Sequence, residues 1–304
     1  MKKIFIYQNT GKERLDKFLQ SQISTLSRSQ IQKKILSGQV LLNGQISSVH
    51  HWLKPGDKIS FHNTVNKEKI SEHIIEPKII GQTKDYLIIN KPSGLLVHPT
   101  DKKETNTLVQ WLLKKFPDLK KVGDDHSRPG IVHRLDREAS GLMVVALNQK
   151  SFTNIKKQFQ DRKVKKEYTV LVHGRMLNDD GEIKTGLVRN KKTGLMKVVA
   201  SDPLAREAYT TYQIEQRFFN FSLLKVQIMT GRTHQIRAHL FSIGHSVVGD
   251  KLYQTRDLRK KKKTLDQRIF LHSATLEFCD LQGKKMRYHS ALPLELKKFL
   301  LTLK

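Results

Sequence analysis

RPGIVHRLDREASGLMVVAL, at residues 128–147, joins a turn, a crowded set of charges and an apolar run. The opening Arg-Pro-Gly is a turn signal, because proline restricts φ and glycine tolerates positive φ. In the apolar run 142–147, the β-branched Val144 and Val145 favour a buried strand. Charged side chains at the mouth of such a strand cost free energy unless they are paired or used in function.

Spacing alone leaves two interpretations of Asp136 open. It is either a structural loop carboxylate that Arg134 or Arg137 holds in place, or part of a functional site. The charges between the turn and the strand fit both hypotheses, so the choice needs information from the rest of the chain.

The composition indicates a polyanionic partner. The 304 residues include 56 Lys and Arg against 28 Asp and Glu, and this net charge of +28 is typical of nucleic-acid binding. The chain has no stretch of about 18 apolar residues to span a bilayer, and its N-terminal apolar run 4–7 is too short for a signal peptide. The single Cys279 excludes an internal disulfide and a cysteine-rich zinc site. We therefore expect a cytoplasmic, nucleic-acid-binding protein of two domains that does not enter a membrane.

Residues 13–61 have the pattern of a small module. Apolar residues at helical spacing are followed by Ser27, a candidate N-cap for a second helix that ends before Gly38. A short strand then enters a tight hairpin at Asn43-Gly44. The basic residues of the helical part are Arg14, Lys17, Arg28, Lys33 and Lys34. Taken singly, each is most simply a solvated charge.

The polar residues 63–76 predict a linker, and residues 77–304 form the larger predicted domain. Within that domain, Ser151 is a candidate helix N-cap, and Tyr168 begins a strand. A tyrosine at the start of a strand usually serves in packing, so the sequence alone gives it no functional role.

Two other segments of this domain are rich in basic residues. The long segment 174–206 predicts either a hairpin arm over RNA or a mobile insertion, and we favour the arm. The run of basic residues at 259–263 predicts an exposed loop.

GRTHQIRAHL, at residues 231–240, is a second motif that carries chemistry. Thr233 is a candidate N-cap, and the apolar spacing after it predicts a helix that Gly244 ends. His234 and Arg237 lie three residues apart on a neighbouring face, beside a helix N-terminus that favours anions. A lone histidine in this position would most simply be structural.

Together these motifs resemble those of the RluA-type RNA pseudouridine synthases. The central string His-Arg-Leu-Asp with Ser-Gly-Leu after it is similar to the family signature, and residues 231–237 resemble its Gly-Arg-Thr-His-Gln-Ile-Arg motif without a change. The resemblance implies that Asp136 is the catalytic residue, that Arg237 pairs with it, and that Tyr168 stacks on the target uracil. It also implies RNA contacts at His133, Arg134, Arg232, His234 and Gln235.

By the same resemblance, Arg134 enters the RNA duplex in place of the flipped nucleotide. One departure is Ala139, where the family usually has threonine. A lost hydroxyl would loosen the loop, but Asp136 and Arg134 remain, so we expect activity.

Residues 13–61 resemble the S4 RNA-binding domain in the order RLDKFL, LSRSQIQKKILSGQVLLNG and LKPGDKI. This resemblance implies a basic helical face that grips structured RNA through its phosphates. The residues expected to make these contacts are Arg14, Lys17, Arg28 and Lys33.

The implied activity is the isomerisation of uridine to pseudouridine in structured RNA, without a cofactor or a metal ion. The favoured substrate is 23S (large-subunit) ribosomal RNA. The alternatives are a pseudouridine synthase for tRNA, and a non-catalytic RNA-binding or ribosome-assembly protein on the same fold. The single cysteine excludes a zinc deaminase, and Glu138 lies too close in sequence to Asp136 for a glycosidase pair.

The expected fold class is α+β. A small S4-like α/β RNA-binding domain at residues 1–62 precedes a mixed, largely antiparallel β-sheet catalytic domain at residues 77–304, and the protein is expected to be a monomer. The sequence leaves open which uridine is modified. It also leaves open whether Asp136 attacks C1′, attacks C6 or removes the C2′ proton.

Overall fold

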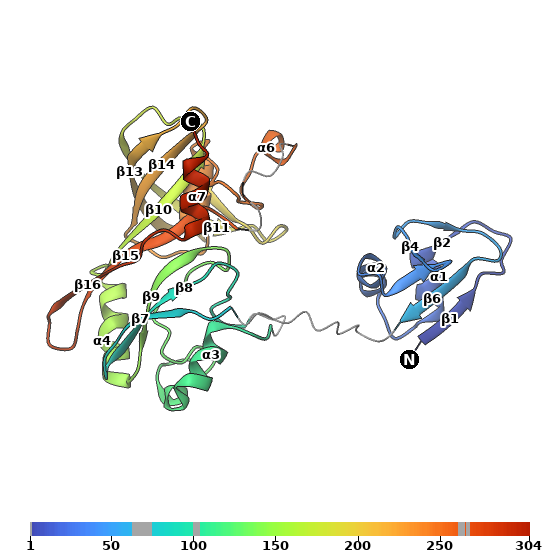
Figure 1. Cartoon of the computed structure of the whole chain (residues 1–304), viewed down its shortest axis with the longest axis horizontal. Coiled ribbons are helices and arrows are strands. Elements are labelled where there is room, and N and C mark those ends of the chain that lie inside the picture. The colour runs from blue at the N-terminus through green and yellow to red at the C-terminus, as the bar shows by residue number, and fades with distance from the viewer. Residues whose placement is uncertain (1, 63–74, 100–103, 261–264, 266–267) are drawn as a thin grey trace. The chain divides into compact units, whose positions relative to one another are not determined.

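The computed structural model describes residues 2–62, 75–99, 104–260, 265 and 268–304. The chain divides into two compact units, Met1–His73 and Ile74–Lys304. Figure 1 shows both, coloured from the N-terminus to the C-terminus. Most of the predicted linker, residues 63–74, lies outside the described residues. In the part of the chain that is described, no helix is long and apolar enough to cross a membrane.

The N-terminal unit packs two helices against a small antiparallel sheet of strand order β1-β6-β3-β4. Its elements are β1 (Lys2–Ile6), β2 (Glu13–Arg14), α1 (Leu15–Gln22), α2 (Arg28–Leu36), β3 (Val40–Leu42), β4 (Gln45–Ile46), β5 (Trp52–Leu53) and β6 (Lys58–His62). Ser27 caps α2 in a reciprocal pair with Gln30, as its position in the sequence predicted. Asn43 and Gly44 have φ values of 51° and 82°, so the predicted tight hairpin is confirmed.

A buried carboxylate, Asp16, joins the two helices of this unit. Its side chain is fully buried, and it accepts hydrogen bonds from Arg14 at 2.9 Å, Arg28 at 3.0 Å and Gln32 at 2.8 Å. Burial alone would raise the pKa of this carboxyl group, but these donors lower the pKa to about 2. The sequence analysis singled out the two arginines and missed the aspartate between them.

Asp16→Asn should destabilise the N-terminal unit by about 2 kcal/mol at neutral pH, since one pKa unit corresponds to about 1.4 kcal/mol. The folded-state pKa lies below the unfolded value, so the contribution is complete above about pH 4 and is lost as the pH falls towards 2. Hydrogen exchange of α1 and α2 in the full chain measures this loss. The exposed Asp118 gives the matched control, Asp118→Asn, and equal protection in both variants would contradict the prediction.

The larger unit is built on a mixed sheet with strand order β12-β11-β13-β14-β10-β15-β9-β8-β7, and β16 pairs with β15. Its strands are β7 (Lys78–Gln82), β8 (Tyr86–Lys91), β9 (Ser140–Ala146), β10 (Lys165–His173), β11 (Asp180–Arg189), β12 (Met196–Val199), β13 (Arg206–Arg217), β14 (Phe221–Ile228), β15 (Leu271–Cys279) and β16 (Lys285–His289). Its helices are α3 (Leu108–Lys115), the short 3₁₀ helix η1 (Pro117–Lys121), α4 (Gln149–Gln160), α5 (Gln235–Ser242), α6 (Arg256–Lys260) and α7 (Leu294–Leu301).

Among the described strand pairs of this sheet, β9 and β15 alone are parallel. The predicted α+β class with a largely antiparallel sheet is therefore confirmed. Gly141 lies at the parallel junction with φ of 117°, and a Cβ there would lie 2.3 Å from the carbonyl oxygen of Ser273. Only glycine lets the two backbones approach this closely, which explains the Ser-Gly pair that follows the central motif.

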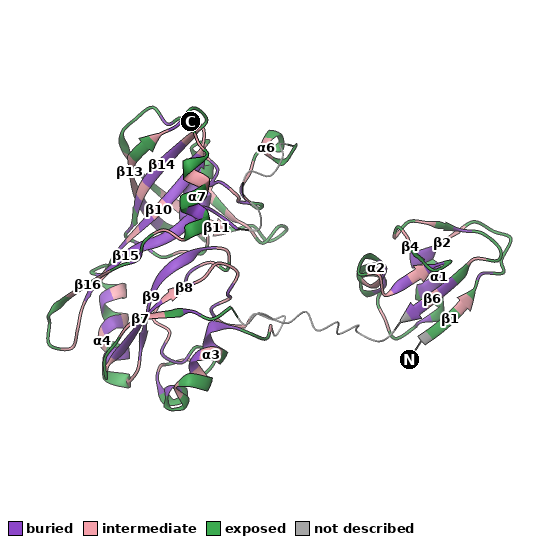
Figure 2. Cartoon of the chain, in the orientation of Figure 1, coloured by how far each residue is buried: buried purple, intermediate pink, exposed green. Residues whose placement is uncertain are grey.

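Strand β9 is the most deeply buried element of the larger unit, as the sequence predicted. Every residue of Ser140–Ala146 is buried (Figure 2). Met143 and Val145 contribute to the main core, while Leu142 and Val144 pack into a second cluster on the other face. A strand covered on both faces reads as a continuous apolar run.

Two predicted helix caps are wrong. The helix after β9 begins one turn earlier than expected, because Asn148 is its N-cap and accepts a hydrogen bond from the backbone N–H of Ser151. Thr233 does not cap α5 either: the N-cap is His234, in the left-handed conformation with φ of 52° and without a capping side-chain bond. In each case a polar side chain stood at a plausible position, but a neighbouring residue has the N-cap geometry.

The segment 174–206 contains the β11–β12 hairpin, so the hairpin of the favoured prediction is confirmed. It does not stand free as an arm, because β11 also pairs with β13 and the hairpin extends the edge of the sheet. In the basic run 259–263, Arg259 and Lys260 end the short helix α6, and residues 261–263 lie outside the described residues.

Candidate active site

The loop between Arg128 and β9 carries Asp136 and is held at both ends. At its start, Gly130 has φ of 69°, and a Cβ there would lie 2.6 Å from the carbonyl oxygen of Ala146, so the predicted turn needs glycine. His133 accepts a hydrogen bond of 3.0 Å from the backbone N–H of Val144, and its ring stacks on Phe159 at 4.6 Å. These contacts fix the first half of the loop against the buried strand.

Lys91 fixes the second half of the loop. Its side chain is fully buried, and its ammonium donates to the carbonyl oxygens of Pro92, Leu95 and Arg137 at 2.9, 2.9 and 3.2 Å. The Ser93 hydroxyl adds a bond of 2.6 Å to the carbonyl oxygen of Glu138. Burial lowers the pKa of Lys91 to about 7. The Lys-Pro-Ser-Gly segment therefore serves as a clamp on the residues that follow Asp136.

Asp136 and Arg237, distant in sequence, form an ion pair. Arg237 Nη1 lies 3.1 Å from Asp136 Oδ2, and the same guanidinium binds Asp250 through two bonds of 2.6 and 2.9 Å. Arg237 and Asp250 are buried, whereas the Asp136 side chain is 16 % exposed. The Glu138 carboxylate lies farther away, 3.8 Å from Arg237 Nη1.

The ion pairs Asp250–Arg237–Asp136 favour the charged forms of Arg237 and Asp250. Burial opposes the ionisation of these two groups, yet the Asp250 and Asp136 carboxylates raise the pKa of Arg237, and Arg237 lowers the pKa of Asp250. Backbone N–H groups of Leu252 and Tyr253 also donate to Asp250. Arg237 therefore stays protonated and presents one of its N–H groups to Asp136.

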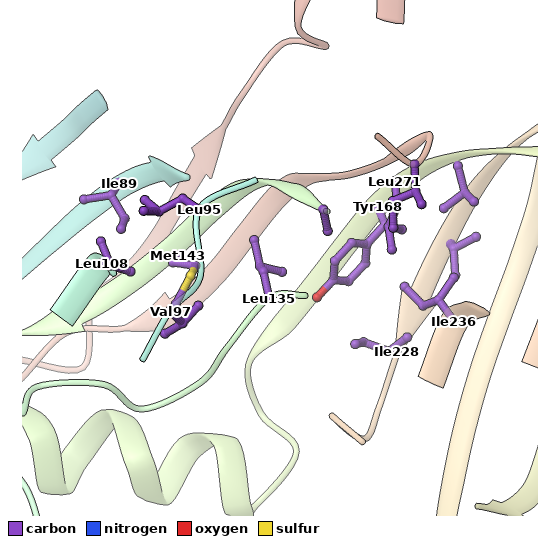
Figure 3. Packing of buried hydrophobic residues seen from close by; sticks show 14 of the residues in the cluster. Ile89, Leu95, Val97, Leu108, Leu135, Met143, Tyr168, Ile228, Ile236 and Leu271 are labelled. Carbon is purple, nitrogen blue, oxygen red and sulfur yellow. The ribbon is translucent and has the colours of Figure 1, made fainter. Parts of the chain in front are cut away.

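Tyr168 is buried beside this pair in an apolar surround. Figure 3 shows its ring among Leu135, Ile228, Ile236 and Leu271. Burial and the nearby Asp136 charge raise the pKa of the Tyr168 hydroxyl, which therefore stays neutral. Tyr168 lines the same pocket as Asp136.

The predicted site residues of the larger unit line one pocket of about 470 Å³. They are His133, Arg134, Asp136, Tyr168, Arg232, His234, Gln235 and Arg237. The volume is ample for a nucleoside, since ligand pockets span roughly 300–1,000 Å³. A lining of mixed apolar and polar side chains, with one carboxylate and several basic groups, suits a planar, uncharged base attached to an anionic backbone.

The predicted RNA-contact residues of this unit differ in how far their polar atoms are already used. Gln235 is buried and bonds to Thr230, Tyr209, Thr210 and the backbone N–H of Arg232. His234 Nδ1 lies 3.1 Å from the Tyr253 hydroxyl, and Arg232 donates to the carbonyl oxygen of Glu207.

Arg134 is the exposed residue of this set, and its Nη1 lies 3.4 Å from His98 Nε2. It lines the same pocket as the half-buried Asp136. Its guanidinium is therefore available at the rim.

The predicted phosphate contacts of the N-terminal unit are of two kinds. Lys17 and Lys33 are exposed, whereas Arg14 and Arg28 are bound to Asp16. An arginine with several donors can bind a carboxylate and still offer an N–H group to a phosphate.

Among the described residues of the larger unit, four buried charges were not predicted from the sequence: Lys91, Lys166, Asp250 and Arg268. A short polar pattern does not show which of its members will be buried. Ala139 is also buried, and its backbone N–H bonds to the Asp136 carbonyl oxygen at 3.2 Å. The loop therefore keeps its turn without a hydroxyl at position 139.

The comparisons with known proteins agree with this geometry. Residues 85–242 match the family described as RNA pseudouridylate synthase, and residues 13–59 match the S4 domain. The solved structure titled "Human RNA Pseudouridylate Synthase Domain Containing 4" has 25 % sequence identity and a TM-score of 0.60, covering 75 % of this chain and 94 % of that one.

Similar sequences cover nearly the whole chain. An uncharacterised RNA pseudouridine synthase of Bacillus subtilis, YlyB, is 36 % identical over 92 % of this chain and 91 % of its own length. The ribosomal large subunit pseudouridine synthase D of Blochmanniella floridana is 30 % identical over 96 % of this chain and 94 % of its own length.

The fold and the site define an RNA-modifying isomerase with a separate RNA-binding unit. The chain belongs to the RluA family of RNA pseudouridine synthases and carries an N-terminal S4 domain. The activity inferred from the motifs, isomerisation of uridine to pseudouridine in RNA, is thereby confirmed.

Arg237→Met should destabilise the larger unit by about 3–5 kcal/mol, because it leaves the buried Asp250 carboxylate without its cation. Equilibrium unfolding in urea measures the change. Arg232→Met removes the same charge from a partly exposed residue of the same motif and should cost less than about 1 kcal/mol. A stable Arg237→Met protein would show that the backbone N–H groups alone can hold Asp250.

Proposed function

We propose that Asp136 is the catalytic residue of uridine isomerisation, that Arg237 holds its carboxylate ionised and oriented, and that Tyr168 stacks on the target uracil. The observation that carries this proposal is the 3.1 Å ion pair between the half-buried Asp136 and the buried Arg237. Asp136 has an exposed edge in the pocket, whereas Asp250 is enclosed, so Asp136 is the member that a substrate can reach.

In the reaction the C1′–N1 bond breaks, the uracil turns, and a C1′–C5 bond forms. The C5 proton leaves to solvent and N1 takes up a proton, so the product is an isomer of the substrate. Asp136 serves as nucleophile or base in this sequence, and the cation beside it stabilises the carboxylate in both roles. The apolar side chains around Tyr168 hold the uracil face during its rotation.

The target uridine has to leave the RNA helix to reach this pocket. Extrusion costs a few kcal/mol, which contacts between the basic protein surface and the phosphates offset. The exposed Arg134 at the rim is the residue we assign to the space that the nucleotide vacates.

Asp136→Asn should lower pseudouridine formation by roughly 1,000-fold or more while RNA affinity changes little, because the amide keeps the volume and loses the charge. Folding should persist, since Arg237 keeps both bonds to Asp250. Single-turnover assays measure the effect. Glu138→Gln is the matched control, because this second carboxylate also faces Arg237 Nη1 but at 3.8 Å. Activity of the Asp136→Asn protein, or an equal loss in both variants, would contradict the assignment of Asp136.

We further propose that the substrate is large-subunit ribosomal RNA and that the protein acts as a monomer in the cytoplasm, where ribosomes assemble. Relatives named ribosomal large subunit pseudouridine synthases C and D are 30 % identical to nearly the whole chain, and the S4 domain adds a second basic RNA anchor. The other candidate substrate is tRNA.

Mapping of pseudouridine in ribosomal and transfer RNA from cells with and without the protein tests the substrate. We expect at least one large-subunit uridine to lose its modification in the deletion strain and regain it with the purified enzyme. Loss confined to tRNA would overturn the ribosomal assignment and leave that of Asp136 untouched.

A further inference from the structure

Lys166 is a buried cation in the wall of the catalytic pocket. It takes no part in the proposed isomerisation step. It lies two residues before Tyr168 on β10, so both side chains point to the same face of the sheet, and both line the pocket. Lys166 is 8 % exposed, and a lysine is rarely buried this far unless its ammonium has a partner.

The protein supplies Lys166 with an aromatic ring but no anion. Its Nζ lies 5.2 Å from the centre of the Phe159 ring, and among the described residues no carboxylate or carbonyl oxygen is hydrogen-bonded to it. Lys91 shows the contrast, because its buried ammonium donates to three carbonyl oxygens. Burial lowers the pKa of Lys166 to about 8, so the group is still largely protonated at neutral pH.

The neighbours of Lys166 leave its ammonium without a bound carboxylate. His133, beside Phe159, is kept neutral, because burial and the Lys166 charge lower its pKa to about 3. Glu167, the next residue along β10, lies 3.7 Å from Lys225 and bonds to Gln227 on β14. Asp136, the carboxylate that lines the same pocket, is paired with Arg237, and no carboxylate of the described residues forms an ion pair with Lys166.

Gly231, the first residue of the second motif, lies beside this ammonium and lines the same pocket. A Cβ at Gly231 would lie 3.6 Å from Lys166 Nζ, so the glycine adds no side chain in contact with the cation. Two residues of strand span roughly 6.6 Å between Lys166 and Tyr168. A nucleotide with its base against Tyr168 can place its sugar along this span and a phosphate beside Lys166.

We propose that Lys166 binds a phosphodiester that flanks the extruded uridine. The proposal rests on the assignment of the pocket to the flipped nucleotide, and it adds the contact that holds the nucleotide's backbone. Lys166 thus anchors the target nucleotide in the pocket, while Asp136 acts on its glycosidic bond. The contact exists before and during the chemical step, so it contributes to binding and not to the rate of the bound complex.

Kinetic assays on total RNA from cells that lack the enzyme test the proposal. Tritium at C5 of uridine is released when the C1′–C5 bond forms, whichever RNA is modified. Lys166→Met should raise the half-saturating RNA concentration roughly 10- to 100-fold, because a charged hydrogen bond to the RNA is lost. The saturating rate should change less than about threefold. Lys166→Arg, which keeps the cation, should recover most of the affinity.

Lys298→Met is the matched control for the lost charge. Lys298 is exposed on α7. This helix packs through Leu296 into a hydrophobic cluster different from the one that contains Tyr168 of the pocket. Its half-saturating RNA concentration should stay within about twofold of the wild-type value.

A modified RNA tests the same contact without a change in the protein. We use a fragment around a uridine that the wild-type enzyme converts, with a neutral methylphosphonate at its 5′ or 3′ linkage. At one of the two linkages the methylphosphonate should weaken RNA binding by the wild-type enzyme by the same factor as Lys166→Met does. The same methylphosphonate should not change RNA binding by the Lys166→Met variant. This arm also decides the question if the Met variant does not fold.

Three results would overturn the proposal. An unchanged half-saturating concentration with the Met variant would mean that Lys166 only covers Phe159. A fall in the saturating rate alone would place its ammonium on the reacting base. Equal methylphosphonate effects on RNA binding by the wild type and the variant would show that Lys166 does not contact that phosphate. In each case a parallel loss of turnover in Asp136→Asn would leave the active-site assignment standing.

Discussion

The ion-pair chain Asp250–Arg237–Asp136 is the interaction on which the site depends. A buried guanidinium is tolerated because Asp250 binds it through two bonds, and the N–H group that remains reaches Asp136. The surrounding elements keep this chain in place: α5 carries Arg237, the segment after it carries Asp250, and the loop before β9 carries Asp136. The Asp136 carboxylate is thus held by an ion pair while part of its side chain stays exposed.

The parallel pair of β9 and β15 creates the place where these parts meet. Antiparallel strands make up the rest of the described sheet, and the loop that enters β9 packs Leu135 into the same cluster as Tyr168 of β10. The close approach of the β9 and β15 backbones at Gly141 and the hydrogen bonds of Lys91 restrict the conformation of that loop. Catalysis needs such pre-organisation, because a carboxylate that has to be reoriented for each turnover loses the advantage of its partner.

The pocket separates three tasks within one cavity. In the proposed complex Asp136 and Arg237 face the bond that breaks, the apolar residues around Tyr168 face the base, and Lys166, Arg134 and the other basic residues face the backbone. All of these residues line the pocket. Charge on the phosphates and planarity of the base are the properties common to all nucleotides in RNA. The pocket therefore suits the reaction, while the choice among uridines requires contacts farther away, of the kind that an S4 domain supplies.

Patterns along the chain were sufficient for the buried strand β9, the Ser27 cap, the Asn43-Gly44 hairpin and the pairing of Asp136 with Arg237, because hydrophobic periodicity, turn chemistry and motif resemblance are all local. The tertiary structure alone decided which charges are buried. Asp16, Lys91, Lys166 and Asp250 look like ordinary polar residues in the sequence, and their burial depends on elements brought together from distant parts of each unit. The same holds for the caps at Asn148 and His234 and for the pairing of the β11–β12 hairpin with β13. Long-range strand pairing set their backbone positions, and that pairing is not encoded in any short segment.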